Sequence, residues 1–197
     1  MEHPLRLPIA TPRLLLRPFT EADDHHLFTL DSDPQVTRYV NGGQPPDMER
    51  IRTQVIPRFL DFQQRYEGLG FYAVEEKESR DFIGWFHFRP KRGNESVIEL
   101  GYRLMRKAWG KGYATEGAQA LLAHGFTEFG VLCVEATALV ANAASIRVME
   151  KCGLRWVENY VEESFPGDDK RAVRYQITVE EWLRKHPDRQ YLTDKDA

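Results

Sequence analysis

Trp109-Gly-Lys-Gly-Tyr-Ala-Thr115 places two glycines, Gly110 and Gly112, between an alternating apolar segment and a segment with helical periodicity. A glycine turn that runs straight into a helix directs backbone N–H groups to the positive end of the helix dipole, which is where proteins bind phosphate. A dinucleotide fingerprint needs a third glycine where Thr115 stands, and a Walker A loop needs a different spacing around its lysine. The stretch therefore predicts a short phosphate cradle, with an ordinary turn as the alternative.

The rest of the chain narrows the class of protein. Its 197 residues suffice for one domain with a real core, and we expect a single domain over 1–197, with its core at about 10–185 and a polar tail at 186–197. A net charge of −3 argues against nucleic acid or an acidic membrane as partner, and no apolar run is long enough for a membrane span. Cys133 and Cys152 lie in apolar segments without metal-ligand spacing. We expect buried thiols, no metal and a cytoplasmic location.

Periodicity predicts alternating strands and helices. The expected strands are 13–18, 71–75, 82–88, 97–105, 131–140, 156–163 and 172–178. The expected helices begin at Thr20, Asp33, Asp47, Ala114, Asn142 and Val179, with a kink at Pro57 and a stop at Gly153. We also expect a hairpin turn over 89–94 and a strand at 131–140 that is buried on both faces. The fold class is α/β (α+β), a mixed and mostly antiparallel sheet flanked by helices.

Several segments together resemble a known family. They are 11–19 (Thr-Pro-Arg-Leu-Leu-Leu-Arg-Pro-Phe), Asp33-Pro-Gln-Val, Ile98-Glu-Leu-Gly-Tyr102, Trp109-Gly-Lys-Gly-Tyr-Ala-Thr-Glu116 and Asn142-Ala-Ala-Ser145 ahead of Lys151-Cys-Gly153. Over about residues 10–185 the chain resembles GNAT-superfamily N-acetyltransferases of the ribosomal-protein N-terminal type, the RimJ/RimL-like branch. This resemblance implies acetyl-CoA as the ligand, with its pyrophosphate in the cradle, and a sheet that splays beside it.

The resemblance also implies which residues hold acetyl-CoA: Lys107, Gly110, Lys111, Gly112, Tyr113, Ala114 and Asn142. The family's motif usually has Arg or Gln where Lys107 stands, so only the backbone role is carried over there. Lys111 is equally well explained as a solvated surface lysine, and Asn142 as a helix N-cap. Many relatives place a tyrosine acid where this chain has Met149. Ser145 is therefore the candidate group that protonates or hydrogen-bonds the departing thiolate, against the alternative of an ordinary first-turn serine.

The chemistry of acyl transfer suggests a base. The amine must be neutral, and at pH 7 roughly one α-amine in ten is neutral, against fewer than one lysine in a thousand. An α-amine acceptor therefore needs only a weak base or a water relayed to a carboxylate. Glu99 shares one face of its strand with Gly101 and Arg103 and is the candidate base, with His87 in reserve. The alternative for Glu99 is a cross-strand ion pair with Arg89 or Arg174.

These observations predict direct acetyl transfer from acetyl-CoA to a primary amine, most simply a protein or peptide N-terminus. A small-molecule amine is the close competitor as acceptor, and a non-catalytic acyl-CoA-binding module is the alternative from another class. We expect no covalent enzyme intermediate, because neither cysteine lies in a nucleophile-like setting. The expected partners are acetyl-CoA and the acceptor, with the chain as a monomer or homodimer.

Overall fold

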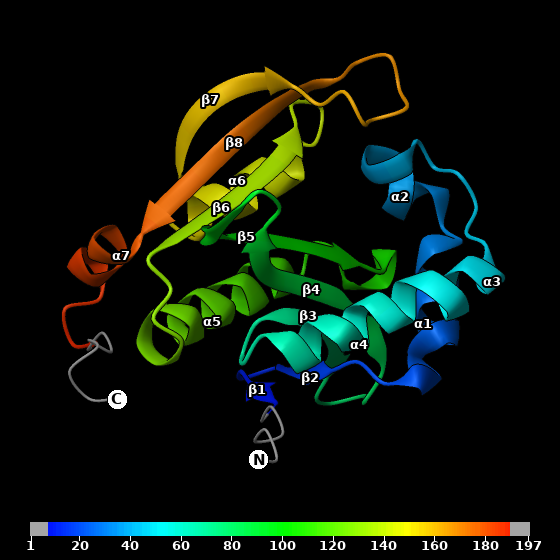
Figure 1. Ribbon diagram of the computed structural model, residues 1–197, viewed down its shortest axis with the longest axis horizontal. Helices are drawn as coiled ribbons and strands as arrows, with labels where there is room; N and C mark the ends of the chain where they lie inside the picture. The colour runs from blue at the N-terminus through cyan, green and yellow to red at the C-terminus, as the bar shows by residue number, and fades with distance from the viewer. Residues whose placement is uncertain (1–7, 190–197) are drawn as a thin grey trace.

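The computed structural model describes residues 8–189 and contains one eight-stranded sheet in the order β1-β2-β3-β4-β5-β6-β8-β7 (Figure 1). The strands are β1 Ile9–Ala10, β2 Leu14–Pro18, β3 Gly70–Glu76, β4 Phe82–Lys91, β5 Asn94–Leu104, β6 Cys133–Leu139, β7 Arg155–Val161 and β8 Arg171–Thr178. Every neighbouring pair is antiparallel except β5 with β6, which is parallel. The mixed, mostly antiparallel sheet is confirmed, and only the two-residue β1 was missing from the predicted strands.

The helices occupy both faces of this sheet. They are α1 Asp24–Asp31, α2 Pro34–Asn41, α3 Met48–Arg50, α4 Ile56–Arg65, α5 Tyr113–Glu128, α6 Ala143–Lys151 and α7 Val179–Lys185. None of the helices in the described residues is long and apolar enough to cross a membrane.

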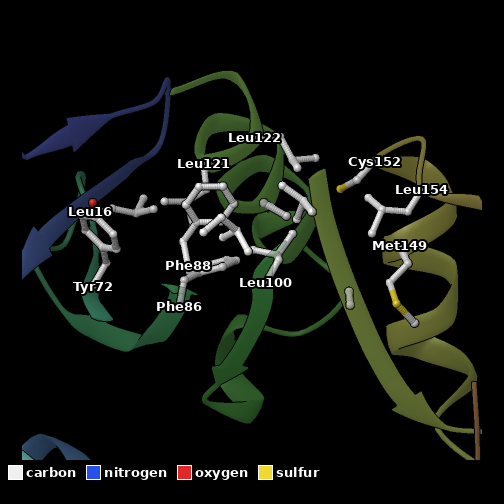
Figure 2. Close-up of a cluster of buried hydrophobic side chains, with 14 of the residues drawn as sticks. Leu16, Tyr72, Phe86, Phe88, Leu100, Leu121, Leu122, Met149, Cys152 and Leu154 are labelled. Atoms are coloured by element: carbon white, nitrogen blue, oxygen red, sulfur yellow. The ribbon is translucent and has the colours of Figure 1, made fainter. Parts of the chain in front are cut away.

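The larger hydrophobic core lies between the sheet and α5, α6 and α7. Leu16, Tyr72, Phe86, Phe88 and Leu100 point from consecutive strands toward Leu121 and Leu122 of α5, and Met149, Cys152 and Leu154 extend the same cluster past β6 (Figure 2). The helix approaches the strands closely because it carries glycine where large rings meet it. A Cβ on Gly117 would lie 2.5 Å from the Phe86 ring, and one on Gly125 would lie 2.5 Å from Phe88.

A second, smaller core lies on the opposite face, under α1 and α4. Phe59 of α4 stacks on Phe71 of β3 with ring centroids 3.8 Å apart, and Phe19 and Phe82 belong to the same cluster. Strand alternation explains the division, because successive side chains of a strand point to opposite faces. Phe71 and Trp85 thus join this second core, while Tyr72 and Phe86 join the first.

The predicted helix from Asp47 to Tyr66 is interrupted. Asp47 caps α3 by accepting the Glu49 N–H at 2.9 Å, and a π-helical turn at Ile51–Val55 precedes α4. Pro57 explains the interruption, because it has no N–H to give to the carbonyl of Thr53, which lies within that wider turn. The irregularity therefore comes in the turn before the proline.

Two other expectations need correction. The hairpin turn predicted over 89–94 is shorter: β4 continues to Lys91 and β5 begins at Asn94, with Gly93 at φ 83°. Strand β6 is not buried on both faces throughout, because Thr137 is exposed. Thr137 lies opposite Arg174 of β8, and its side chain is open to solvent there. The other predicted strands and helices appear within a few residues of their expected bounds.

Strands β5 and β6 separate soon after they meet. Their parallel pairing consists of Ile98 with Val134 and Glu99 with Glu135, although β5 continues to Leu104 and β6 to Leu139. The remaining halves diverge next to the turn that leads into α5 (Figure 1). This is the splay that we predicted from the family resemblance, and Glu99 stands at its apex.

Candidate active site

The predicted phosphate cradle has the geometry of an uncapped helix end. Gly110 and Gly112 have φ of 74° and 83°, which side-chain-bearing residues rarely adopt, and Gly112 is the N-cap of α5. No side chain caps this helix, unlike α6 and α7, whose N-caps Asn142 and Thr178 accept backbone N–H groups. The N–H groups of the first α5 turn therefore point to solvent and can bind an anion. A Cβ on Gly110 would meet nothing within 4 Å, so the turn faces open space.

The cradle is held from behind by the segment before β2. Arg13 donates from Nη1 to the Lys111 carbonyl at 2.9 Å, and from Nε to Glu116 Oε2 at 2.7 Å. Thr11 donates its hydroxyl to Glu116 Oε1 at 2.6 Å. Burial alone would raise the pKa of Glu116, but the bonds from Thr11 and Arg13 outweigh it and lower that pKa. The sequence analysis missed this clamp, although Thr11 and Arg13 belong to a segment that carried the family resemblance.

The predicted lysines and tyrosine of the cofactor set have partners within the chain. Lys107 Nζ lies 2.6 Å from Asp81 Oδ2, and Lys111 Nζ lies 3.8 Å from Glu76 Oε1. Tyr113 is buried and donates its hydroxyl to Glu76. Both lysines are exposed, so neither is fixed toward the cradle. What the structure offers an anion here is the backbone of the turn, which includes the N–H groups of Tyr113 and Ala114.

Glu99 makes the cross-strand ion pair that we gave as its alternative. Its Oε2 lies 3.0 Å from Nη2 of Arg89, the residue opposite it on β4. Its Oε1 lies 3.4 Å from His87 Nε2 without the geometry of a hydrogen bond, and that buried nitrogen has no hydrogen-bond partner among residues 8–189. The imidazole packs directly over Gly101, where a Cβ would come within 2.5 Å of the ring. The predicted base and its reserve thus lie together at the apex of the splay.

The charges at this apex are set by burial and by neighbours. Burial lowers the pKa of His87, and the nearby Glu99 only partly opposes this, so the imidazole is neutral at pH 7. Burial alone would raise the pKa of Glu99, but His87, Arg89 and Lys91 outweigh it and lower that pKa. At neutral pH the site therefore contains a carboxylate beside a neutral imidazole.

Asn142 and Ser145 lie on the other side of the splay, at the start of α6. Asn142 caps the helix by accepting the Ser145 N–H at 3.3 Å, so its cap role is observed. The Ser145 side chain interacts with the hydroxyl of Tyr102 on β5. Burial raises the pKa of Tyr102 more than this interaction lowers it, so Tyr102 carries its proton at neutral pH. The predicted site residues did not include Tyr102, although it ends the segment 98–102 that carried the family resemblance.

A cavity of about 220 Å³ lies near the carboxyl end of β6. It is lined by Arg38, Tyr39, Leu139, Ala141, Phe165 and Asp169. The loop between β7 and β8 reaches the end of α2 here (Figure 1), and a Cβ on Gly42 would lie 3.6 Å from Pro166. Ala141, which lines the cavity, directly precedes Asn142 in the chain. The cavity thus lies close to the proposed site, between α2 and the β7–β8 loop.

The cysteines are poor nucleophiles. Burial raises the pKa of Cys152 to about 12 and also raises the pKa of Cys133, so both are thiols at neutral pH. Residues 8–189 contain no group of three or more His, Cys, Asp or Glu side chains arranged to hold a metal ion.

Comparison with known proteins identifies the family. Residues 13–155 match the acetyltransferase (GNAT) domain family. The chain is 36% identical over 186 residues to FsC-acetyl coenzyme A-N(2)-transacetylase of Aspergillus fumigatus, covering 88% of this chain and 77% of that protein. It is 29% identical to the structure of a GNAT-family acetyltransferase from Bacillus anthracis, with a TM-score of 0.71 over 88% of this chain and 99% of that one.

A third structure shares the fold at lower identity. The ribosomal L7/L12 alpha-N-protein acetyltransferase RimL, in complex with coenzyme A, superposes with a TM-score of 0.76 at 18% identity, over 89% of this chain and 99% of that one. At this identity the likeness concerns the fold. The family match, the first relative and the uncapped glycine cradle agree, and the chain belongs to the GNAT acetyltransferase family as an acetyl-CoA-dependent N-acetyltransferase.

Proposed function

We propose that this enzyme acetylates an α-amine, and that the N-terminus of a protein or peptide is its acceptor, as in the RimJ/RimL-like branch. The observation that carries the proposal is the ion pair between Glu99 and Arg89, 3.0 Å long at the apex of the splay. A carboxylate held this way, with a lowered pKa, is a weak base. It suits an amine with a pKa of about 7.7–8.0 and is poorly matched to a lysine at about 10.4.

In this proposal each part of the site has a separate role in acetyl transfer. The N–H groups of Gly110, Lys111, Gly112, Tyr113 and Ala114 hold the pyrophosphate of acetyl-CoA. The unpaired backbone edges of β5 and β6 bind the arm that carries the acetyl group. Glu99 attracts the acceptor ammonium and receives its proton, directly or through one water. The Ser145 hydroxyl, hydrogen-bonded to Tyr102, supplies the proton that the departing thiolate needs. Most of the rate enhancement comes from positioning, because no strong base is present.

A small-molecule amine is the second candidate acceptor. The cavity beside Ala141 supports it, because about 220 Å³ provides room for a small molecule. The A. fumigatus relative also carries a name that refers to N(2) of FsC and to no ribosomal protein. This acceptor would use the same cradle, the same Glu99 and the same Ser145.

A calorimetric titration of acetyl-CoA tests the cofactor site first. We expect micromolar binding to the wild type and none to Gly112→Trp, whose side chain would cover the cradle. A panel of N-terminal peptides, lysine-containing peptides blocked at the N-terminus, and small amines then identifies the acceptor. Faster turnover of blocked lysine peptides than of free N-termini would refute the α-amine proposal. Binding to the wild type that survives in Gly112→Trp would place acetyl-CoA elsewhere.

A further inference from the structure

Arg58, in the first turn of α4, carries a positive charge that the fold does not compensate. Its guanidinium carbon lies 5.7 Å from the ring centroid of Phe59 and 5.9 Å from that of Phe71. Within residues 8–189 no carboxylate pairs with Arg58. Arg89 and Arg103, by contrast, pair with Glu99 and Asp31. Arg58 is therefore held against the aromatic face while its donors remain available.

Other positive charges surround Arg58. Its pKa is lowered first by burial and then by the charges of Arg89 and Arg50. Arg58 thus has the positive charges of Arg89 and Arg50 nearby, and of these three arginines only Arg89 has a carboxylate partner within the described residues, namely Glu99. The Arg58 side chain is exposed, so an anion can reach its unpaired guanidinium, and a bound anion would offset the repulsion from the neighbouring arginines.

The arginines adjoin the candidate catalytic base. Phe71, under Arg58, meets His87 edge to face with centroids 6.0 Å apart, and His87 lies 3.4 Å from Glu99. Arg89 lies near both Arg58 and Glu99, because its charge acts on Arg58 and it forms an ion pair with Glu99. An anion bound by Arg58 would therefore belong to a molecule whose other end reaches Glu99.

We propose that Arg58, assisted by Arg50 and Arg89, binds a carboxylate of the acceptor, so that the enzyme selects amines with an acidic group a short distance away. For a peptide acceptor this means Asp or Glu in the first few positions after the N-terminus. The guanidinium fork suits a carboxylate because two N–H groups donate to its two oxygens, and the rings of Phe59 and Phe71 hold the fork in place. This inference rests on the proposed function and adds the acceptor's chemical class.

Binding of acetylated product peptides tests the inference without relying on turnover. The probes are pairs of N-terminally acetylated peptides that differ only in Asp against Asn at the second, third or fourth position, titrated into the CoA-loaded enzyme. We expect one Asp peptide to bind about tenfold more tightly than its Asn partner, as for one charge-assisted ion pair. The ratio should fall to about one in Arg58→Ala, stay above one in Arg58→Lys and invert in Arg58→Glu.

Arg65→Ala is the matched control, because Arg65 is an exposed arginine at the end of the same helix and pairs with Asp61 at 2.9 Å. It should leave the Asp-to-Asn ratio unchanged. A parallel comparison of N-acetylated amino acids with their amides shows whether the selected carboxylate belongs to a side chain or to the main chain. A ratio near one in every wild-type pair, or a preference that persists in Arg58→Ala, would overturn the inference.

Turnover of the unacetylated peptides is measured separately. If peptides are acetylated at equal rates regardless of charge, the proposed function stands and the carboxylate site fails. If carboxylate-bearing products bind through Arg58 while no peptide N-terminus is acetylated, the site stands and the peptide acceptor fails. The two claims are thus tested by different readouts.

Discussion

Arg89 Nη2 lies 3.0 Å from Glu99 Oε2, directly across the β4–β5 ladder, and Glu99 is the last residue of β5 that pairs with β6. This ion pair fixes the carboxylate where the two strands part. It also keeps Glu99 ionised, because a nearby cation favours the charged form of an acid. Glu99 therefore stays a carboxylate that can accept a hydrogen bond from the acceptor amine, but it removes a proton weakly.

The pH dependence of the reaction should consequently follow the acceptor. The pKa of Glu99 is lowered from 4.5 and that of His87 from 6.5, so neither group titrates between pH 6.5 and 9. We expect kcat/KM to rise with pH and to level off at about 7.7–8.0 for an ordinary α-amine. For acceptors whose amine has a lower pKa, the pH at which kcat/KM levels off should fall by the same amount. If that pH stays the same when the acceptor amine is changed, the titrating group belongs to the enzyme instead.

Replacing the carboxylate should slow catalysis without affecting the cofactor. In Glu99→Gln we expect kcat to fall by about a hundredfold, the low end of general-base effects, because the base is weak. Acetyl-CoA affinity should change little, since Glu99 lies on β5 and not in the glycine turn. Arg92→Ala, in the nearby hairpin turn, is the control variant. Full kcat in Glu99→Gln would assign proton removal to water alone.

The clamp behind the cradle should contribute to acetyl-CoA affinity. Arg13→Ala removes the bonds to the Lys111 carbonyl and to Glu116, so the turn loses its support. We expect acetyl-CoA to bind about three- to tenfold more weakly, the equivalent of roughly one hydrogen bond, measured by calorimetry. Glu116→Gln should have a smaller effect, because the amide oxygen can still accept from Thr11. Unchanged affinity in Arg13→Ala would show that the glycine turn keeps its conformation unaided.

Local sequence pattern predicted the elements and the glycine turn before α5 well, because both depend on neighbours in the chain. The alternation of side chains along the strand placed Glu99 on the face that Leu100 does not share, and Asn142 was expected as a helix cap. Contacts between distant segments were harder to foresee. Arg13 and Glu116 are 103 residues apart, and their contact depends on how the α5 helix packs beside β2. Of the two partners suggested for Glu99, sheet register selects Arg89, while Arg174 pairs with Glu135 and Glu158.

Arg58 and Tyr102 show why parts of the site could not be predicted. The position of Arg58 over Phe71 depends on the path of α4, which the π-helical turn before Pro57 helps to set. The contact of Tyr102 with Ser145 crosses the gap between β5 and α6. No periodicity within one segment encodes such a pairing across the sheet.

Acid should remove the stability that Asp23 supplies. Its carboxylate is 2% exposed and accepts Arg17 Nη2 at 2.8 Å and the Thr20 N–H at 2.8 Å. Burial alone would raise the pKa of Asp23, but Arg17, Thr20 and His26 outweigh it and lower that pKa to about 2. Because the folded-state pKa is below the unfolded-state value of 3.8, this stability is present above about pH 4 and is lost as pH falls toward 2.

Denaturant unfolding of Asp23→Asn measures that contribution. We expect a loss of about 1.5–3 kcal/mol at pH 7, typical of a hydrogen-bonded charged group. The difference from wild type should narrow as pH falls below about 4. Asp168→Asn, at an exposed position in the β7–β8 loop, is the control and should match the wild type throughout. A constant difference down to pH 2.5 would show that Asp23 does not titrate with unfolding.

Ser145 and Tyr102 should act together on the departing thiolate. Each is a hydroxyl at the splay, and burial keeps the Tyr102 proton in place at neutral pH. We expect Ser145→Ala to lower kcat by about a hundredfold, the low end of the range for positioned proton donors, with acetyl-CoA affinity near normal. If Tyr102 acts through Ser145, Tyr102→Phe lowers kcat less, and the double variant is no slower than Ser145→Ala alone. Ser145→Thr, which retains the hydroxyl, should recover part of the activity. Independent, additive losses in the two single variants would show that the two hydroxyls act separately, and full activity in Ser145→Ala would remove the serine from the reaction.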